Sequence, residues 1–284
     1  MRLVAKDRRL GWGLIAPALI WTAAFFILPF LAMLALSFAS MDGREVVRGF
    51  DPGNYARVFT DPVMLGALVN SLEITVTVTV VSVILAYPLA AIIAFQVPAR
   101  WQRLALLMAV LPFWTSYVVR SYSWLLVLGQ NGVVNQTLLA TGLIAQPLEI
   151  AATRAATVIG FVHFFVMLLT LTIYANLIQL SPNYMRAAQD LGASRWQTFV
   201  HVILPLTLPG VVTGAFLTFV LCIGDYITPQ ILGGNAELTL PQLIMLQLGR
   251  SGNFPLASAL SVVLMAVVTL AYFASSRWLR LDRV

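Results

Sequence analysis

Six apolar stretches, separated by short polar segments, dominate the pattern of hydrophobic and polar positions along the chain. A helix needs about 20 predominantly apolar residues to cross a bilayer, and each stretch reaches that length. The first follows several basic residues, as a signal peptide does, but its apolar core is longer than the roughly 7–15 residues of a cleaved signal. We therefore interpret it as a retained helix. The pattern predicts six transmembrane helices, at about residues 13–38, 69–95, 104–128, 155–178, 203–223 and 256–277.

The composition agrees with a chain that lies mostly in lipid. Hydrophobic residues make up 60% of the 284 residues and charged residues 10%, and the mean hydropathy is +0.89. A soluble domain carries about a quarter charged residues, so too little polar surface remains here to cover a soluble globule. We expect an all-α integral membrane protein that forms a single transmembrane domain over residues 1–284.

The net charge of +6 does not indicate a nucleic-acid partner, because the basic residues lie in short segments between apolar stretches, as topology signals do. The polar segments fall alternately on the two sides of the membrane. Eleven basic residues lie on the side that includes both termini, and five lie in the segments of the opposite side. Since basic residues are enriched on the cytoplasmic side, both termini are predicted to be cytoplasmic, which agrees with an even number of spans. The eleven are Arg2, Lys6, Arg8, Arg9, Arg100, Arg103, Arg186, Arg195, Arg277, Arg280 and Arg283.

The two long outer segments, residues 41–68 and 129–153, carry local structure signals. Asp51-Pro52-Gly53-Asn54 and Gln130-Asn131-Gly132 predict turns. Asp61-Pro62 predicts the start of a short helix.

The segment between the fourth and fifth stretches, residues 179–202, carries strong helix start and stop signals. Ser181-Pro182 predicts a helix N-cap followed by proline at the first helical position. Gly192 predicts the end of that helix, because glycine tolerates the left-handed conformation found after many helices. Ser194 with Gln197 three residues later predicts the capping box of a second helix. The sequence therefore predicts a short helix, a tight turn and a second helix across the membrane face.

Two interpretations of this segment stay open on physical grounds: an ordinary interfacial hairpin, or a docking surface for a partner protein. Met185, Ala188 and Leu191 are expected on one face of the first helix, because they are spaced by three residues. The small residues Ala187, Ala188 and Gly192 favour docking, since small side chains let a partner backbone approach closely.

The run Arg-Ala-Ala-Gln-Asp-Leu-Gly-Ala from Arg186, followed by Ile203-Leu204-Pro205-Leu206, resembles the EAA loop of ABC importer permeases. That family's pattern is Glu-Ala-Ala, then glycine four residues after the second alanine, then an ending similar to Ile-x-Leu-Pro. Ala187, Ala188 and Gly192 fit this spacing. The chain departs from the pattern at Arg186, which stands in place of the family's glutamate.

A wider resemblance, to the spermidine/putrescine branch of these permeases, extends over most of the chain. Its motifs are Leu-Pro-Phe-Trp-Thr-Ser from Leu111 with Arg120, the Asn131-Gly132 loop, and Gly-Asp-Tyr-Ile-Thr-Pro from Gly224 before Leu232-Gly233-Gly234.

The resemblance implies a type I importer permease of the bacterial inner membrane, in which the segment above is a coupling helix that sits in a cleft of an ATP-binding subunit. ATP-driven closure of two such subunits would switch the pathway between inward and outward access. A second permease subunit, an extracytoplasmic solute-binding protein and surrounding lipid are the further implied partners. The residues expected to carry the coupling are Met185, Arg186, Ala187, Ala188, Asp190, Leu191 and Gly192.

The family's glutamate can pair with a basic residue of the ATPase, so Arg186 places that contact in doubt. Two alternatives could replace that contact. Arg186 could pair with an acidic patch of the ATPase, or the second permease subunit could carry a greater share of the docking.

The chain carries no motif for hydrolysing ATP. A P-loop needs Gly-x-x-x-x-Gly-Lys-Ser/Thr, and Lys6 is the only lysine, with no glycine before it. ATP and Mg²⁺ are therefore expected on a partner chain, while this chain is expected to hold no cofactor and no catalytic residue. The two histidines lie far apart and Cys222 is the only cysteine, so neither a metal site nor an intrachain disulfide is expected.

Charged residues within the apolar stretches are costly and are therefore functional candidates. Carboxylates among aromatic faces suit an ammonium group, through charge pairing and cation–π attraction. The alternative is that the aromatic residues are interfacial anchors, that Glu73 pairs with Arg120 or reaches water, and that His163 is a hydrogen-bonded packing residue. The substrate-path candidates are Glu73, Trp114, Tyr117, Arg120, Tyr122, Asp225 and Tyr226.

The branch resemblance favours putrescine or spermidine as substrate, and another small amine or zwitterion, such as a betaine, an opine or an aminophosphonate, stays open. An ion-coupled secondary transporter would need coupling-ion ligands near the midplane and commonly an internal repeat, and the sequence shows neither. A membrane-embedded enzyme would need a cluster of His, Asp or Glu residues at suitable spacing, which the sequence also lacks.

Overall fold

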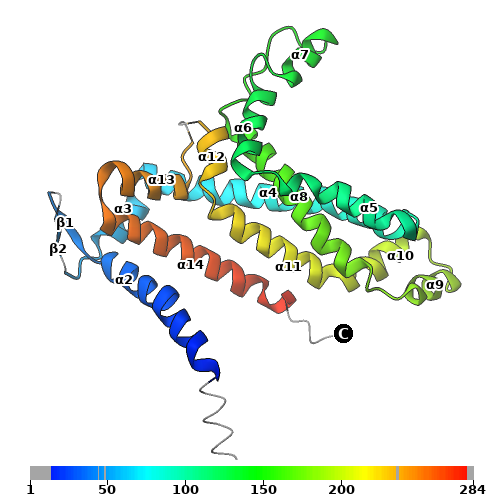
Figure 1. Ribbon diagram of the computed structural model, residues 1–284, viewed down its shortest axis with the longest axis horizontal. Coiled ribbons are helices and arrows are strands. Elements are labelled where there is room, and N and C mark those ends of the chain that lie inside the picture. Colours follow the sequence, from blue (N-terminus) through cyan, green and yellow to red (C-terminus); the bar gives the residue numbers. More distant parts are fainter. Residues whose placement is uncertain (1–13, 44, 48, 235–236, 280–284) are drawn as a thin grey trace, which may run out of the picture. The chain divides into compact units, whose positions relative to one another are not determined.

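The computed structural model describes residues 14–43, 45–47, 49–234 and 237–279 (Figure 1). They belong to two compact units, residues 1–64 with 243–263 and residues 65–242 with 264–284, and each unit is described by itself. Several residues used for the sequence predictions lie outside the described part of the chain. They are Gly13, the expected start of the first span, and the basic residues Arg2, Lys6, Arg8, Arg9, Arg44, Arg48, Arg280 and Arg283.

Among the described residues, five helices are long and apolar enough to cross a membrane. They correspond to the predicted first, second, fourth, fifth and sixth spans, with shifted ends. The fifth starts at Arg195 and the second at Pro62, both earlier than predicted. The second does so because the proline that was expected to open a short helix opens the long one instead. The five are Leu14–Leu36, Pro62–Phe95 (α4), Arg154–Leu177 (α8), Arg195–Ile223 and Phe254–Ser276.

The third predicted span, residues 104–128, is a bent pair of helices rather than one straight helix. The axis bends by 89° at a break after Trp114. Pro112 has no backbone N–H for the helical ladder, and Thr115 and Ser116 are extended, with ψ of 150° and 132°. The described chain therefore reaches six spans only if this bent pair counts as one. The three pieces are α5 (Ala99–Val110), the 3-10 turn η2 (Leu111–Trp114) and α6 (Tyr117–Leu128).

The first unit contains a small antiparallel hairpin and a short helix that sequence reasoning did not predict. The turn expected around Asn54 is the start of this helix, α3. The Asn54 side-chain amide donates to the carbonyl oxygens of Ser37 at 3.0 Å and Ala39 at 2.8 Å, so it ties α3 to the end of the preceding helix. The elements of this region are η1 (Ala23–Ile27), α2 (Leu28–Leu36), β1 (Ser40–Asp42) paired with β2 (Glu45–Val47), α3 (Gly53–Thr60) and η4 (Gln247–Ser251).

In the second unit, α4, α8 and α11 (Leu204–Ile223) lie side by side (Figure 1). Two apolar clusters fill the space between them, and each cluster takes side chains from all three helices. Cys222, the lone cysteine, is buried in one of them. Representative members are Tyr87, Ile173 and Val211 in the first cluster and Val78, Phe165 and Cys222 in the second.

Glycines let α8 and α11 approach closely. A Cβ added to Gly210 would lie 2.1 Å from Cγ of Asn176, and one added to Gly214 would lie 2.8 Å from a methyl carbon of Leu169. The Asn176 amide donates to the carbonyl oxygen of Thr172 at 2.8 Å. Because lipid provides no hydrophobic driving force between helices, their association depends on such close packing.

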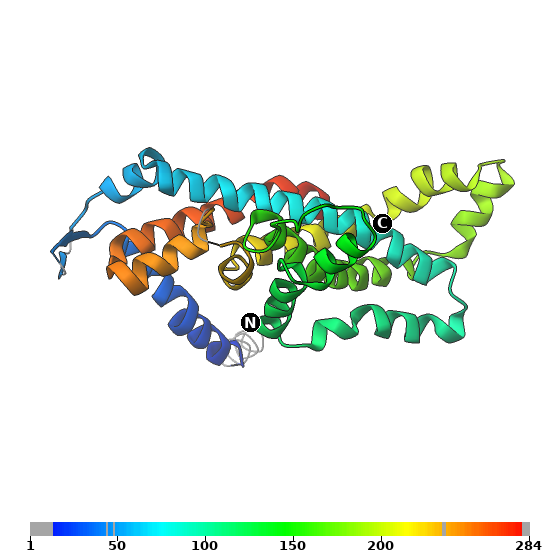
Figure 2. The ribbon, with the colours of Figure 1, turned by 90° about the horizontal axis from the view of Figure 1, so that it is seen from above.

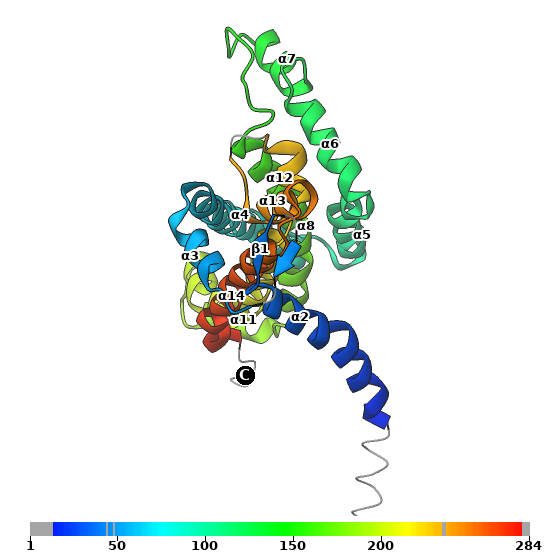
Figure 3. The ribbon, with the colours of Figure 1, turned by 90° about the vertical axis from the view of Figure 1, so that its left-hand side faces the viewer.

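Seven further elements complete the described chain. They are α7 (Val133–Ala140), α9 (Pro182–Asp190), α10 (Arg195–Thr198), η3 (Phe199–Ile203), α12 (Ile227–Leu232), α13 (Leu240–Leu246) and α14 (Phe254–Leu279). Within the second unit, α9 and α10 lie at the opposite end of α8 and α11 from α12 (Figure 2). Helices α6 and α7 extend away from the bundle of α4, α8 and α11 (Figure 3). The outer segment 129–153, for which turn signals were noted, also holds the helix α7.

We expect Gly210→Ala to destabilise the protein by about 1–3 kcal/mol, the usual cost of overpacking. The new Cβ would overlap the Asn176 side chain, which must move and give up its bond to Thr172. The matched control is Gly66→Ala in α4, where nothing lies within 4 Å of the added carbon; there alanine favours the helix by about 0.8–1.0 kcal/mol. Thermal melting in detergent compares the two variants, and equal melting temperatures would contradict the close packing.

Candidate functional site

The structure confirms the predicted boundaries of α9 and α10. Ser181 caps α9 by accepting a hydrogen bond from the Asn183 N–H at 3.3 Å. Gly192 follows the helix with φ of +83°. Ser194 and Gln197 form the reciprocal capping box of α10, with N···O distances of 3.2 and 2.8 Å. Local signals in the sequence therefore suffice to define this helix–turn–helix.

Only part of the expected face of α9 is buried. Ala188 is buried, and Met185 packs against the apolar cluster shared by α4, α8 and α11. Leu191, by contrast, is 89% exposed. It occupies the C-cap with ψ of 4°, where the chain has already left the helix. Its apolar side chain is therefore presented to solvent beside Ala188 and does not pack against the bundle.

An open hollow of about 630 Å³ lies between α9 and the helix that follows it. Arg186 and Asp190 are exposed on α9, and no described carboxylate of this unit lies within 4.0 Å of the Arg186 guanidinium. Because most residues at the turn are small, the hollow can receive a side chain or backbone of another protein. Its lining includes Ala187, Ala188, Leu191, Gly192, Ala193 and Gln197.

A second site lies where α6 meets the loop between α11 and α12. The Tyr117 hydroxyl donates to the Asp225 carboxylate and also contacts the Thr228 hydroxyl. Asp225 accepts two more hydrogen bonds, from Thr228 Oγ1 at 2.9 Å and from the Ile227 N–H at 2.8 Å. All these donors are neutral, and no described cation of this unit lies within 4.0 Å of Asp225. The carboxylate is therefore well held, while its negative charge has no counter-ion among the described residues of this unit.

Arg120 lies one turn further along α6. Its guanidinium donates to the carbonyl oxygen of Pro112 at 2.9 Å, and its Cζ lies 4.8 Å from the ring centroid of Phe164 and 5.4 Å from that of Tyr117. Arg120 thus holds the bend between η2 and α6. The same bend brings the hydroxyl of Tyr117 to Asp225.

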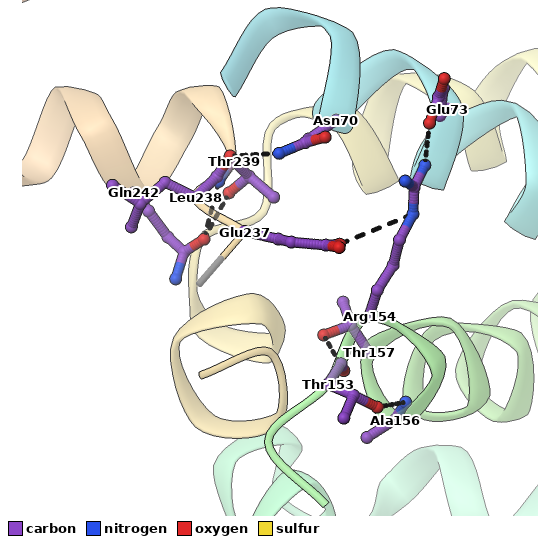
Figure 4. Close-up of polar contacts among 10 residues, drawn as sticks. All are labelled: Asn70, Glu73, Thr153, Arg154, Ala156, Thr157, Glu237, Leu238, Thr239 and Gln242. Carbon is purple, nitrogen blue, oxygen red and sulfur yellow. Dashed lines mark hydrogen bonds and ion pairs between the residues drawn. The ribbon is translucent and has the colours of Figure 1, made fainter. Parts of the chain in front are cut away.

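Glu73 pairs with Arg154, the first residue of α8, so the alternative of a Glu73–Arg120 pair is wrong. Arg154 also lies 4.0 Å from Glu237 in the loop before α13 (Figure 4). The three side chains are between 32% and 55% exposed. Ion pairs of this kind contribute about 0–1 kcal/mol, so the network joins three chain segments without adding much stability.

The aromatic candidates differ in their placement. Tyr117 is half-buried and takes part in the contacts of both Asp225 and Arg120. Trp114 is 85% exposed, and Tyr122 and Tyr226 are also exposed. Among the aromatic candidates, Tyr117 is the one whose ring lies against the Arg120 guanidinium, together with Phe164 of α8, which was not a candidate.

Sequence reasoning did not single out Arg154, Phe164, Thr228 or Glu237. Thr228 stands in the same short motif as Asp225, and Arg154 opens an apolar stretch, so both carried a usable signal. Phe164 carried none, because an apolar residue within an apolar stretch does not stand out. The neighbouring His163 accepts a hydrogen bond from Trp124 Nε1 at 3.1 Å, which agrees with its expected role in packing.

The chemistry of these sites defines a class of protein. A carboxylate in the loop after α11 and a guanidinium on α6, the latter held against aromatic rings, can bind a polar solute. An exposed helix pair at one end of the bundle can receive a partner. Fold and sites together are those of a membrane transport subunit. The chain belongs to the family of binding-protein-dependent transport system inner membrane components, whose family model matches residues 67–281.

Several permeases are similar over three quarters or more of the chain. The spermidine/putrescine transport system permease protein PotB of Escherichia coli K12 is 32% identical over 263 residues, which cover 91% of this chain and 95% of PotB. PotB of Haemophilus influenzae is also 32% identical, and the alignment covers 91% of this chain and 91% of that protein. The inner membrane ABC transporter permease protein YdcU of Escherichia coli K12 is 31% identical over 225 residues, or 75% of this chain and 72% of YdcU.

Solved structures show the same fold. A crystal structure of a bacterial ABC transporter involved in the import of the acidic polysaccharide alginate aligns with a TM-score of 0.76 at 18% identity, covering 98% of this chain and 99% of that chain. An inward-facing structure of the MetNI methionine ABC transporter aligns with a TM-score of 0.60 at 16% identity, covering 77% of this chain and 95% of that chain. The predicted family and the predicted all-α type I importer permease fold are confirmed.

We expect Tyr117→Phe to destabilise the protein by about 1–3 kcal/mol, because it removes a donor from the partly buried Asp225 carboxylate. Tyr122→Phe, an exposed hydroxyl on the same helix, is the control and is expected to change stability by less than about 0.5 kcal/mol. Thermal melting of the two variants in detergent checks the difference. An equal effect of both substitutions would mean that the Tyr117 hydroxyl does not hold Asp225.

Proposed function

We propose that this permease imports a polyamine, putrescine or spermidine, as the membrane-spanning subunit of an ATP-driven importer. The observation that supports a polyamine as the substrate is the 32% identity to PotB over 91% of the chain. Asp225 supplies matching chemistry: its carboxylate is held by neutral donors alone, so its charge remains available to an ammonium group. The ring of Tyr117, beside it, offers a face for cation–π contact.

In this proposal α9 is the coupling helix, and α9 with α10 faces the cytoplasm. Two ATP-binding subunits hold ATP and Mg²⁺ and hydrolyse the nucleotide, a second permease subunit completes the pathway, and an extracytoplasmic binding protein delivers the substrate. The open hollow beside α9 and the small residues that line it support the docking. The alginate transporter, whose fold this chain shares, has been crystallised in complex with its substrate-bound periplasmic protein.

Arg186 distinguishes this chain from the family pattern at the docking surface. Its side chain is exposed and has no described ion-pair partner within its unit. An acidic patch on the ATP-binding subunit would suit it, as would a docking mode in which the second permease subunit carries the family's glutamate.

The test of the substrate is uptake of labelled putrescine and spermidine into proteoliposomes that hold the complete complex, with and without ATP and binding protein. We expect ATP-dependent polyamine uptake, and we expect Asp225→Asn to reduce it strongly, because the amide keeps the shape but not the charge. Glu73→Gln is the control, since its partly exposed carboxylate is already paired with Arg154. ATP-dependent uptake of a betaine or an aminophosphonate instead would retain the importer and reject the polyamine, and ion-driven uptake without ATP would reject both.

The coupling role of the turn after α9 has its own test, Gly192→Val. A β-branched residue at φ of +83° is strained, and such strain costs about 1–3 kcal/mol. The matched control is Gly142→Val: Gly142 has φ of +69°, and both glycines have open space around the missing Cβ. We expect similar melting temperatures for the two variants but loss of ATP-dependent uptake only for Gly192→Val. Equal uptake by both would remove the coupling role from this turn.

A further inference from the structure

A pocket of about 230 Å³ lies beside Arg120, between α6 and α8. Thr115, Val119 and Ser123 are exposed and form its mouth, whereas Arg120 is only 8% exposed and lies deeper. Trp124 and His163 complete the polar part of the wall. The pocket therefore leads from the surface of this unit to a buried positive charge.

The described protein groups accept hydrogen bonds from only some of the N–H groups of the Arg120 guanidinium. A guanidinium carries five N–H donors, and the described hydrogen bond uses one of them, to the carbonyl oxygen of Pro112. The rings of Phe164 and Tyr117 cover its faces but accept no in-plane hydrogen bond. No described carboxylate of this unit lies within 4.0 Å, because both described ion pairs belong to Arg154. A buried charge without a counter-ion is costly.

The other polar groups of the pocket leave Arg120 as the dominant charge. The hydroxyls of Thr115 and Ser123 donate to backbone carbonyl oxygens at 2.7 and 2.9 Å. Trp124 Nε1 donates to His163 Nδ1, so the ring proton of a neutral His163 lies on Nε2 and is a further donor. A pocket with these groups attracts an anion and disfavours an ammonium group.

We propose that this pocket binds an anionic oxygen group, a phosphate or a carboxylate, on the free N–H groups of Arg120. Planar guanidinium groups match both anions with paired hydrogen bonds. The volume is below the roughly 300–1,000 Å³ of a pocket for a whole small-molecule ligand, so it suits a head group whose remainder lies outside the mouth. Two sources share this chemistry: the phosphodiester of an anionic lipid that enters past the exposed Val119, and a small carboxylate or phosphate from water.

This anion site goes beyond the proposed polyamine transport and does not depend on the substrate. It also differs from a purely mechanical role of Arg120 in holding the bend of α5 and α6, because a mechanical role requires no anion. The two roles predict different responses to lipid, to free anions and to a carboxylate built into the pocket.

The experiment measures thermal melting of the complete complex in nanodiscs of phosphatidylcholine, with or without added phosphatidylglycerol, inorganic phosphate or acetate. We expect phosphatidylglycerol, or one of the free anions, to raise the melting temperature by a few degrees, because a ligand that binds only the folded state stabilises it. A response to the lipid alone identifies the head group as the occupant. A response to phosphate or acetate in pure phosphatidylcholine identifies the free anion.

Ser123→Asp places a carboxylate on the pocket wall, three residues from Arg120 on the same helix, where the two side chains can pair. We expect this variant to melt higher than the wild type in phosphatidylcholine and to have lost its response to added anions. Ser123→Asn, which has the same shape without the charge, is the matched control and should keep the wild-type response. If no anion stabilises the wild type, or if Ser123→Asp responds to anions as the wild type does, the site is not in this pocket and the proposal is overturned.

Discussion

The close approach of α8 and α11 is the contact on which the rest of the larger unit depends. In lipid, apolar side chains gain little by leaving their surroundings, so two helices associate through van der Waals contact between complementary surfaces. Gly210 and Gly214 remove the side chains that would hold α11 away from α8. Gly160, nearer the start of α8, does the same for Leu232 of α12. Helix α8 thus anchors both α11 and the short helix α12 that follows it.

The position of α8 also determines the electrostatics of the candidate site. Its first residue, Arg154, pairs with Glu73 at a solvent-exposed position, where an ion pair contributes little free energy. Deeper along the same helix, Phe164 covers the guanidinium of Arg120, and no described carboxylate of the unit balances that charge. Arg154 is paired with carboxylates, while Asp225 and Arg120 are held by neutral groups, and this difference leaves the charges of Asp225 and Arg120 available to a ligand.

Pro112 has consequences that reach far from its own position. By interrupting the helical ladder, it permits the turn that directs α6 away from α5, and Arg120 closes that turn by donating to its carbonyl oxygen. Tyr117, at the start of the new helix, then reaches Asp225 and Thr228, more than 100 residues later in the sequence. A straight helix through this region would carry Tyr117 along the bundle axis. Bend and site are therefore one structural feature.

The sequence by itself determined the membrane class, five of the spans and the helix–turn–helix at Gly192, because length, apolar content and capping residues act within about 20 consecutive positions. It also carried the motif that contains Asp225. Only the tertiary structure decided that Glu73 pairs with Arg154 and that Phe164 covers Arg120. These contacts depend on the angle of a bend and on the rotation of packed helices. No short stretch of sequence encodes them, since they join residues that come together only after the helices have packed.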